Sequence, residues 1–167
     1  MRRIAGMSIA VAGIVAALIV GVAVATPPSG IVTAPIIGRG HFTDDVRMKF
    51  KIKRHGTKPV VVSMEDPSEV VAQQITLAPD GHTGWHTHPG PAVVVVKSGA
   101  MTLTMADRAC STHNYSTGEA FVDVGRGNVH IGRNASSTEP LELHVTYFDV
   151  PTGESPRLDA EEPTRCR

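Results

Sequence analysis

"GWHTHPGPAVVVVKSG", residues 84–99, places two histidines directly before a Pro-Gly-Pro turn and a run of four valines. His86 and His88 are separated by one residue. In a β-strand, residues i and i+2 point to the same face, so both imidazoles lie on one side of the chain. Two imidazoles on one face can bind a single metal ion. The stretch therefore predicts a pair of metal ligands at the start of an apolar strand.

A third histidine, His130, lies in a similar strand-and-turn context, in the run NVHIGR that follows Gly127. Three neutral imidazole nitrogens that converge on one ion form a facial set and leave other coordination positions open. We therefore expect one divalent transition metal held by His86, His88 and His130. Imidazole binds iron, manganese, zinc, nickel and copper, so the spacing does not distinguish among these metals.

The rest of the sequence favours an all-β fold. From residue 46, the run VRMKFKIK alternates apolar and basic side chains, as a half-buried strand with a solvated basic face does. The chain has 16 glycines, 12 prolines and only 19% charged residues, and it shows no helical periodicity. These features predict a β-sandwich or barrel. Further strand-like runs lie at residues 59–64, 69–78, 91–99, 100–105, 119–124, 128–133 and 141–150.

The order and spacing of the histidine runs resemble the two motifs of the cupin superfamily. In the first motif His86, His88 and Gly99 fall in register, whereas Gly81 is one place from its position. In the second motif the matching residues are Gly118, Gly127, His130 and Asn134. This second motif has one extra residue, and Gly125 stands where proline is usual. The resemblance covers residues 46–150. It implies a cupin jelly roll, a double-stranded β-helix barrel, with the three histidines as metal ligands.

The sequence departs from the first motif at its glutamate. That position falls on Ala92, or on Val93 with the longer spacing, and neither side chain can bind a metal. Three neutral histidines leave the charge of a divalent ion uncompensated, which favours an anionic or oxygen-donor ligand in the open positions. Cupins with three-histidine sites include iron-dependent thiol dioxygenases and diketone-cleaving dioxygenases, so the resemblance implies a metal-dependent dioxygenase or another small-molecule cupin enzyme.

Several residues near the histidines are candidates for a supporting role. Asp123 shares a strand face with Phe121, where it either orients a ligand histidine or forms a carboxylate at the rim. Trp85 lies on the opposite pleat from His86 and either packs in the core or lines the pocket entrance. Asn134 occupies the asparagine position of the second motif.

The N-terminal segment is predicted to direct export. Residues 1–25 have a basic start, an uncharged run and the sequence Ala-Val-Ala, and they read as a signal peptide or, if uncleaved, as an N-terminal membrane anchor. Residues 26–45 form a linker with a candidate edge strand, residues 46–150 the barrel, and residues 151–167 a polar tail. The folded part is therefore expected to be secreted or extracytoplasmic.

Two cysteines agree with this location. In an oxidising compartment Cys110 and Cys166 would form a disulfide that ties the tail to the domain; the alternative is two free thiols. The 16 basic and 16 acidic side chains balance, so no nucleic-acid partner is expected, and contact with a membrane is expected only through the N-terminal segment. Cupins often pair through edge strands, which makes a homodimer compatible with the resemblance.

Three functions remain open at this point. The first is a metal-dependent enzyme acting on a small polar molecule in the barrel. The second is a non-catalytic extracytoplasmic protein that binds a small ligand or the metal itself. The third is a structural cupin whose metal site has decayed. Because imidazole must be neutral to bind a metal, the unperturbed histidine pKa of about 6.5 predicts that protons compete with the metal below that pH.

Overall fold

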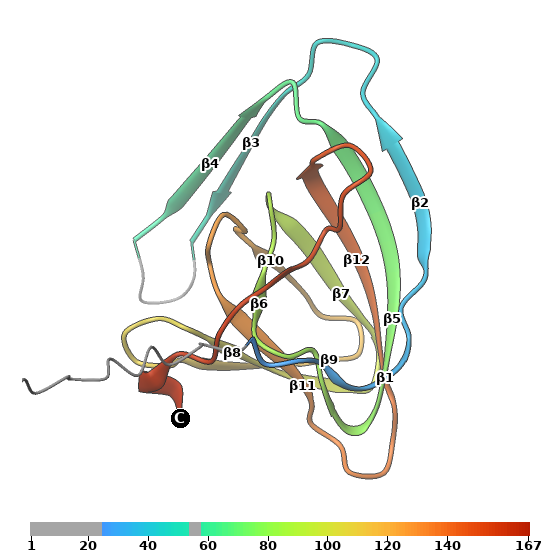
Figure 1. Cartoon of the computed structure of the whole chain (residues 1–167), viewed down its shortest axis with the longest axis vertical. Coiled ribbons are helices and arrows are strands. Elements are labelled where there is room, and N and C mark those ends of the chain that lie inside the picture. The colour runs from blue at the N-terminus through green and yellow to red at the C-terminus, as the bar shows by residue number, and fades with distance from the viewer. Residues whose placement is uncertain (1–24, 54–57) are drawn as a thin grey trace, which may run out of the picture.

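The computed structural model describes residues 25–53 and 58–167, and these residues form strands and one short 3-10 helix (Figure 1). The N-terminal strands are β1 (Ser29–Thr33) and β2 (Ile36–His41), followed by the hairpin β3 (Arg47–Ile52) and β4 (Val60–Glu65). The other elements are β5 (Glu69–His82), β6 (His86–Thr87), β7 (Ala92–Ser98), β8 (Ala100–Met105), β9 (Thr112–Ser116), β10 (Ala120–Asp123), β11 (His130–Asn134), β12 (Leu141–Val150), β13 (Leu158–Asp159) and the helix η1 (Thr164–Cys166).

One antiparallel sheet makes up the barrel. Its strands follow the order β10-β7-β12-β5-β11-β6-β13, with β1 and β2 also paired to β5 and with β8 and β9 extending from β11. The sheet curls until it is nearly closed, as Figure 1 shows. The predicted all-β jelly-roll barrel is therefore confirmed.

Alternating side chains fill the interior of the barrel. Along β7, Ala92, Val94 and Val96 are buried, and the residues between them face outward or lie at the surface. The same alternation runs along β8 and β12 and joins one apolar core. Each fully buried valine or leucine side chain contributes about 1.5–3 kcal/mol, so this core fixes which face of each strand points inward.

The strand predicted at residue 46 forms, but it does not join the barrel. β3 pairs with β4 in a separate two-stranded sheet, which stands apart from the barrel in Figure 1. Along β3 the residues alternate between half-buried and exposed, so its apolar face is only partly covered. Phe50 packs against Phe148 of β12 with ring centroids 5.3 Å apart. Alternation predicts a half-buried strand correctly here, but it does not identify the strand's partner.

The linker predicted at residues 26–45 holds two strands rather than one edge strand. Both β1 and β2 pair with β5, and the chain breaks between them at Pro35, which has no amide hydrogen to donate to a ladder. The predicted signal segment lies outside the described residues except for Ala25. Within the described residues no helix is long and apolar enough to cross a membrane.

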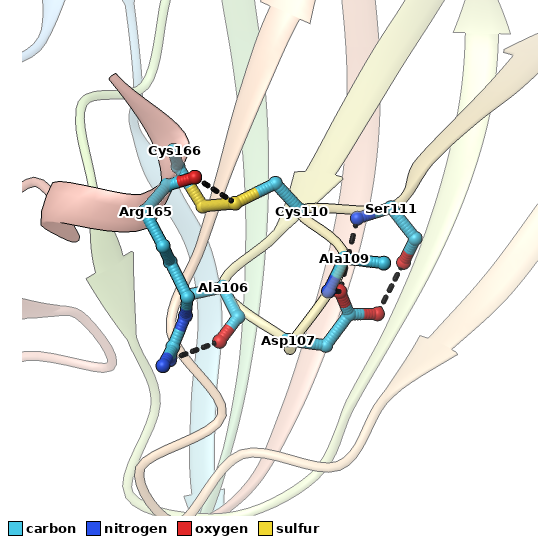
Figure 2. The surroundings of a disulfide bond; sticks show 7 residues. All are labelled: Ala106, Asp107, Ala109, Cys110, Ser111, Arg165 and Cys166. Atoms are coloured by element: carbon cyan, nitrogen blue, oxygen red, sulfur yellow. Dashed lines mark hydrogen bonds between the residues drawn. A yellow bond between two sulfur atoms is a disulfide. The ribbon is translucent and has the colours of Figure 1, made fainter.

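The C-terminal tail crosses the face of the barrel. In Figure 1 the red segment after β12 runs past β6 and ends at η1. A disulfide joins Cys110, in the β8–β9 turn, to Cys166, with the two Cα atoms 5.5 Å apart (Figure 2). Beside it, Arg165 Nη2 donates to the carbonyl of Ala106 at 2.7 Å. The tail is thus fastened at its far end to the domain.

Candidate metal centre

Strand pairing brings the three histidines together. His130 of β11 is directly opposite His86 of β6 in an antiparallel pair, and His88 follows two residues after His86. All three are 6% exposed or less, and their ligand atoms lie within 4.8 Å of one another. The ring centroids are 4.4 Å apart for His86 and His130 and 4.9 Å apart for His86 and His88. The predicted residues therefore form a buried cluster able to hold a metal ion.

Each ring is oriented by a backbone carbonyl. Because every Nδ1 is within hydrogen-bond distance of a carbonyl, it carries the ring's proton, and Nε2 is left with a free lone pair for a metal. The Nδ1–H groups donate as follows: His86 to Gly84 O at 2.8 Å, His88 to Pro156 O at 2.8 Å, and His130 to Asn128 O at 3.0 Å.

Two of the rings remain neutral well below neutral pH. Burial lowers the pKa of His88 to about 4, and repulsion from His130 adds to this effect. Burial likewise lowers the pKa of His86 well below 6.5, with further repulsion from His130 and His88. Neutral imidazole is the form that binds a metal, so His86 and His88 do not have to lose protons before they bind an ion at neutral pH.

Asp123 supports the cluster through the loop that carries His130. It is 1% exposed, which excludes the rim position that the sequence left open. Its carboxylate accepts hydrogen bonds from the amide of Gly125, at 3.0 Å, and from the side chain of Asn128. Asp123 Oδ1 is 3.7 Å from His130 Nδ1, too far for a hydrogen bond. Asp123 thus holds Asn128, whose carbonyl orients His130.

Gly125 explains one departure from the second motif. Its φ is +62°, which proline cannot adopt, and a Cβ there would lie 2.0 Å from the carbonyl oxygen of Gly90. The next residue, Arg126, donates its amide to the carbonyl of His88 at 2.8 Å. The β10–β11 loop therefore packs directly against the strand that carries the first two histidines.

Ala92 occupies an inward position beside the cluster. It is fully buried, and in the sheet it lies between Asp123 of β10 and Tyr147 of β12. Val93 has the opposite orientation, because neighbouring residues of a strand point to opposite faces. Of the two candidates for the motif's glutamate position, Ala92 is thus the one on the interior face.

Two adjoining cavities surround the cluster. The inner cavity, about 30 Å³, is lined by all three histidines together with apolar side chains that include Val94 and Phe121. This volume is sufficient for a water molecule or a similarly small ligand. The outer cavity, about 510 Å³, adjoins it at His86 and His88 and extends to β1, β2 and residues 153–157.

Tyr147 and Thr83 line both cavities. The ring of Tyr147 lies 4.9 Å from that of His88, and its hydroxyl donates to Gln73 Oε1 at 3.1 Å. Burial raises the pKa of Tyr147, so its hydroxyl stays protonated and acts as a neutral hydrogen-bonding group. The alternation along β12 indicates that Tyr147 faces the interior, but it does not reveal that its ring lines the two cavities.

Arg157 is a site residue that the sequence did not indicate. It lines the outer cavity, its Nε donates to Asp159 Oδ1 at 2.7 Å, and its buried Nη2 has no hydrogen-bond partner in the described structure. Its charge makes a smaller contribution, after burial and the other histidines, to the lowered pKa of His86. The polar composition of residues 151–167 predicts a tail at the surface. In the structure, the pairing of β13 with β6 places Arg157 near the histidines.

Among the other candidates, Trp85 and Asn134 have structural positions, whereas Phe121 lines the inner cavity. Trp85 is 2% exposed and is not among the residues lining the two cavities, so it packs. Phe121 lines the inner cavity and stacks on Tyr115, with centroids 4.5 Å apart. Asn134 donates to the carbonyls of Ala78 and Glu139, at 3.0 and 2.8 Å, and so joins strand ends away from the histidines.

A comparison with protein families agrees with this architecture. A family model described as Cupin domain matches residues 73–147, which include all three histidines. Solved structures similar to the chain include the polyketide cyclase RemF from Streptomyces resistomycificus, with 22% identity, 58% of this chain and 64% of that chain covered, and a TM-score of 0.45. An oxalate oxidase in complex with the substrate analogue glycolate has 23% identity, coverage of 48% and 42%, and a TM-score of 0.42.

A cupin domain from Bordetella pertussis Tohama I has 25% identity, with 47% of this chain and 80% of that chain covered and a TM-score of 0.40. The chain spans less than two thirds of the length of the first two structures. A search of curated proteins finds no significant match. The domain match, the antiparallel barrel and the paired histidine motifs agree: the chain contains a cupin domain.

Proposed function

We propose that this cupin binds one divalent transition metal through Nε2 of His86, His88 and His130 and uses the metal to bind a small oxygen-donor molecule. The observation that carries the proposal is the burial and orientation of the three imidazole rings. Each ring is buried, and its Nδ1 is hydrogen-bonded to a backbone carbonyl. Imidazole nitrogen is a favourable ligand for iron, nickel, copper and zinc. The donor set therefore fits the metal that the family implies.

The inner cavity that would hold this molecule is small and is lined mainly by apolar side chains. When bound, the metal would supply an electrophilic centre with open positions and, if it is iron or manganese, redox chemistry. Thr83 and Tyr147 offer hydroxyl groups at the boundary of the two cavities, and the apolar side chains exclude water. Because no carboxylate, lysine or cysteine lines the inner cavity among the described residues, chemistry there would depend on the metal.

This dependence supports a metal-dependent oxygenase as the enzymatic form of the proposal. A non-catalytic extracytoplasmic binding protein is the second form, supported by the same lack of a carboxylate, lysine or cysteine among the described residues that line the inner cavity. For the location we propose the extracytoplasmic space. The basic and apolar residues 1–25 and the disulfide between Cys110 and Cys166 support it, because disulfides persist mainly in oxidising compartments.

The test is the metal content of protein purified without added metal. Replacing His86, His88 or His130 by Ala should each abolish stoichiometric metal binding, because two imidazoles bind a divalent ion much more weakly than three. His144→Ala is the matched control, since His144 is exposed on β12. Full occupancy in His130→Ala would contradict the ligand set. Iron or manganese in the wild type would favour oxygen chemistry, and an empty site would favour a structural cupin.

A further inference from the structure

The outer cavity is closed on one side by a segment of the C-terminal tail, residues 153–159, which we call the strap. At its start the amide of Gly153 donates to Glu69 Oε2 at 3.2 Å, and Arg39 Nη2 donates to the carbonyl of Glu154 at 2.7 Å. In its middle the carbonyl of Pro156 accepts the hydrogen bond from His88. At its end β13 pairs with β6, with Leu158 opposite Thr87. The strap is therefore a built part of the site.

The strap holds Arg157 beside the metal ligands. Its two neighbours, Pro156 and Leu158, both contact the strand that carries His86 and His88, and Arg157 lines the outer cavity with these histidines. The side chain is 25% exposed, and its Nη2 is buried without a hydrogen-bond partner in the described structure. A buried charged donor without an acceptor is costly, which points to an acceptor supplied by a ligand.

Among the described residues that line the cavity, Arg157 is the cation with a buried, unused donor. Arg39 also lines the cavity, but its guanidinium is engaged by the carboxylate of Glu69 and the carbonyl of Glu154. Arg157 is bonded to Asp159 only through Nε, and this leaves Nη2 available. The cavity therefore has a positive group on the strap, beside the histidines that also line it.

We propose that the outer cavity binds a small carboxylate, with its carboxyl group on Arg157 and a second oxygen donor of the same molecule directed toward the histidine cluster. Guanidinium groups bind carboxylates through planar, charge-assisted hydrogen bonds. Nη2 of Arg157, which has no acceptor in the described structure, matches one carboxyl group, and the second carboxyl group of a dicarboxylate can extend toward the histidines. The histidine end of this binding mode rests on the proposed function, but the Arg157 end does not need the metal.

The test is calorimetric titration of succinate into the metal-free protein and into the Zn²⁺-loaded protein at constant ionic strength. The neutral diamide of succinate and inorganic phosphate serve as comparison probes. We expect succinate to bind both forms and to bind the Zn²⁺-loaded form more tightly, and the diamide to bind neither measurably. Tighter binding of phosphate than of succinate would overturn the assignment to carboxylates.

Arg157→Gln should weaken succinate binding by about tenfold or more, because it removes the charge-assisted bond. Arg157→Lys should retain part of the affinity, since it keeps the charge without the planar geometry. Arg47→Gln is the control: it also removes one positive charge, but from an exposed arginine of the separate β3–β4 hairpin. Succinate affinity in this control should stay within about twofold of the wild type.

The same variant should change Zn²⁺ affinity in the opposite direction. The guanidinium repels a cation held by His86 and His88, so Arg157→Gln should bind Zn²⁺ as tightly as the wild type or more tightly. Unchanged succinate affinity in Arg157→Gln would overturn the proposal, and so would a joint loss of both ligands, which would show that Arg157 supports only the strap's structure. If wild-type protein binds succinate through Arg157 but holds no metal, the proposed function fails and this inference stands.

Discussion

At the scale of single residues, the site depends on three carbonyls that come from different parts of the chain. Gly84 precedes the His-x-His strand, Asn128 belongs to the loop before β11, and Pro156 belongs to the strap. Each carbonyl fixes one ring and leaves its Nε2 free. The cluster is therefore complete only when the two motif regions and the tail are all in place. A structural change in any of these three segments can alter the orientation of a ligand histidine.

Ala92→Glu tests whether the position left without a carboxylate faces the metal. The substituted carboxylate would lie on the interior face between Asp123 and Tyr147, so we expect tighter Zn²⁺ binding from an added charged ligand. Overpacking of the core should lower the free energy of unfolding by about 1–3 kcal/mol. Competition with a chelator of known affinity measures the Zn²⁺ dissociation constant.

Val93→Glu is the control for this experiment, because it adds the same charge on the opposite face of β7. Its Zn²⁺ affinity should match that of the wild type. Equal affinity in Ala92→Glu, Val93→Glu and the wild type would show that residue 92 does not face the metal.

The sequence predicts the three histidines because strand periodicity and motif spacing are local properties. It leaves the position of Asp123 undecided, since the choice between rim and interior depends on how the sheet closes. It does not indicate Arg157, whose place is set by a short strand pair between the tail and β6. It also predicts proton competition from an unperturbed pKa, whereas burial lowers the pKa of His86 and His88 and moves that competition to more acidic pH.

At the scale of elements, the sequence predicts strands better than their partners. The alternating run at β3 is a strand, but it pairs with β4 alone. The linker contains two strands because β5 is long enough to pair with both β1 and β2 along its length. Hydrophobic alternation shows which face of a strand is buried; which neighbour covers that face is decided by the packing of the whole sheet.

The disulfide should act as a fastener for the strap. Replacing both Cys110 and Cys166 by Ser removes a link across 56 residues, worth at most about 4 kcal/mol in loop-closure entropy. We expect the melting temperature of the metal-free protein to fall by up to about 10 °C, measured by calorimetry. The double substitution is preferred because a single free thiol could itself bind the metal.

Loss of the disulfide should also weaken metal binding through His88, because the carbonyl that orients this ring belongs to the strap. Zn²⁺ affinity should therefore fall in the double-serine variant, and reduction of the wild-type disulfide should reproduce both effects. An unchanged melting temperature and Zn²⁺ affinity would show that β13 and the contacts at Gly153 hold the strap without the disulfide.

At the scale of the whole molecule, the apolar core and the site share one interior. The core cluster extends along β12 from Leu141 to Val150, and one of its members, Tyr147, also lines both cavities. The histidines thus lie where the packed core gives way to a solvent-connected space. Burying neutral imidazoles at this boundary makes the stability of the whole barrel depend on pH, because the unfolded chain exposes the same groups to water.

The last prediction follows from this dependence and concerns the metal-free protein. Unfolded histidines titrate near pH 6.5, whereas burial holds the pKa of His88 at about 4 in the folded state and lowers that of His86 in the same direction. As pH falls below about 6.5 the unfolded chain takes up protons that the folded chain does not, so the free energy of unfolding decreases until the folded pKa is reached. For His88 alone the loss is about 2 kcal/mol between about pH 7 and pH 5.

Urea denaturation measures the free energy of unfolding across this pH range, which lies above the range in which carboxylates titrate. His88→Gln, which cannot titrate there, should show a shallower slope, and a wild-type profile that is flat from pH 6.5 to pH 5 would contradict the assignment of neutral, buried rings.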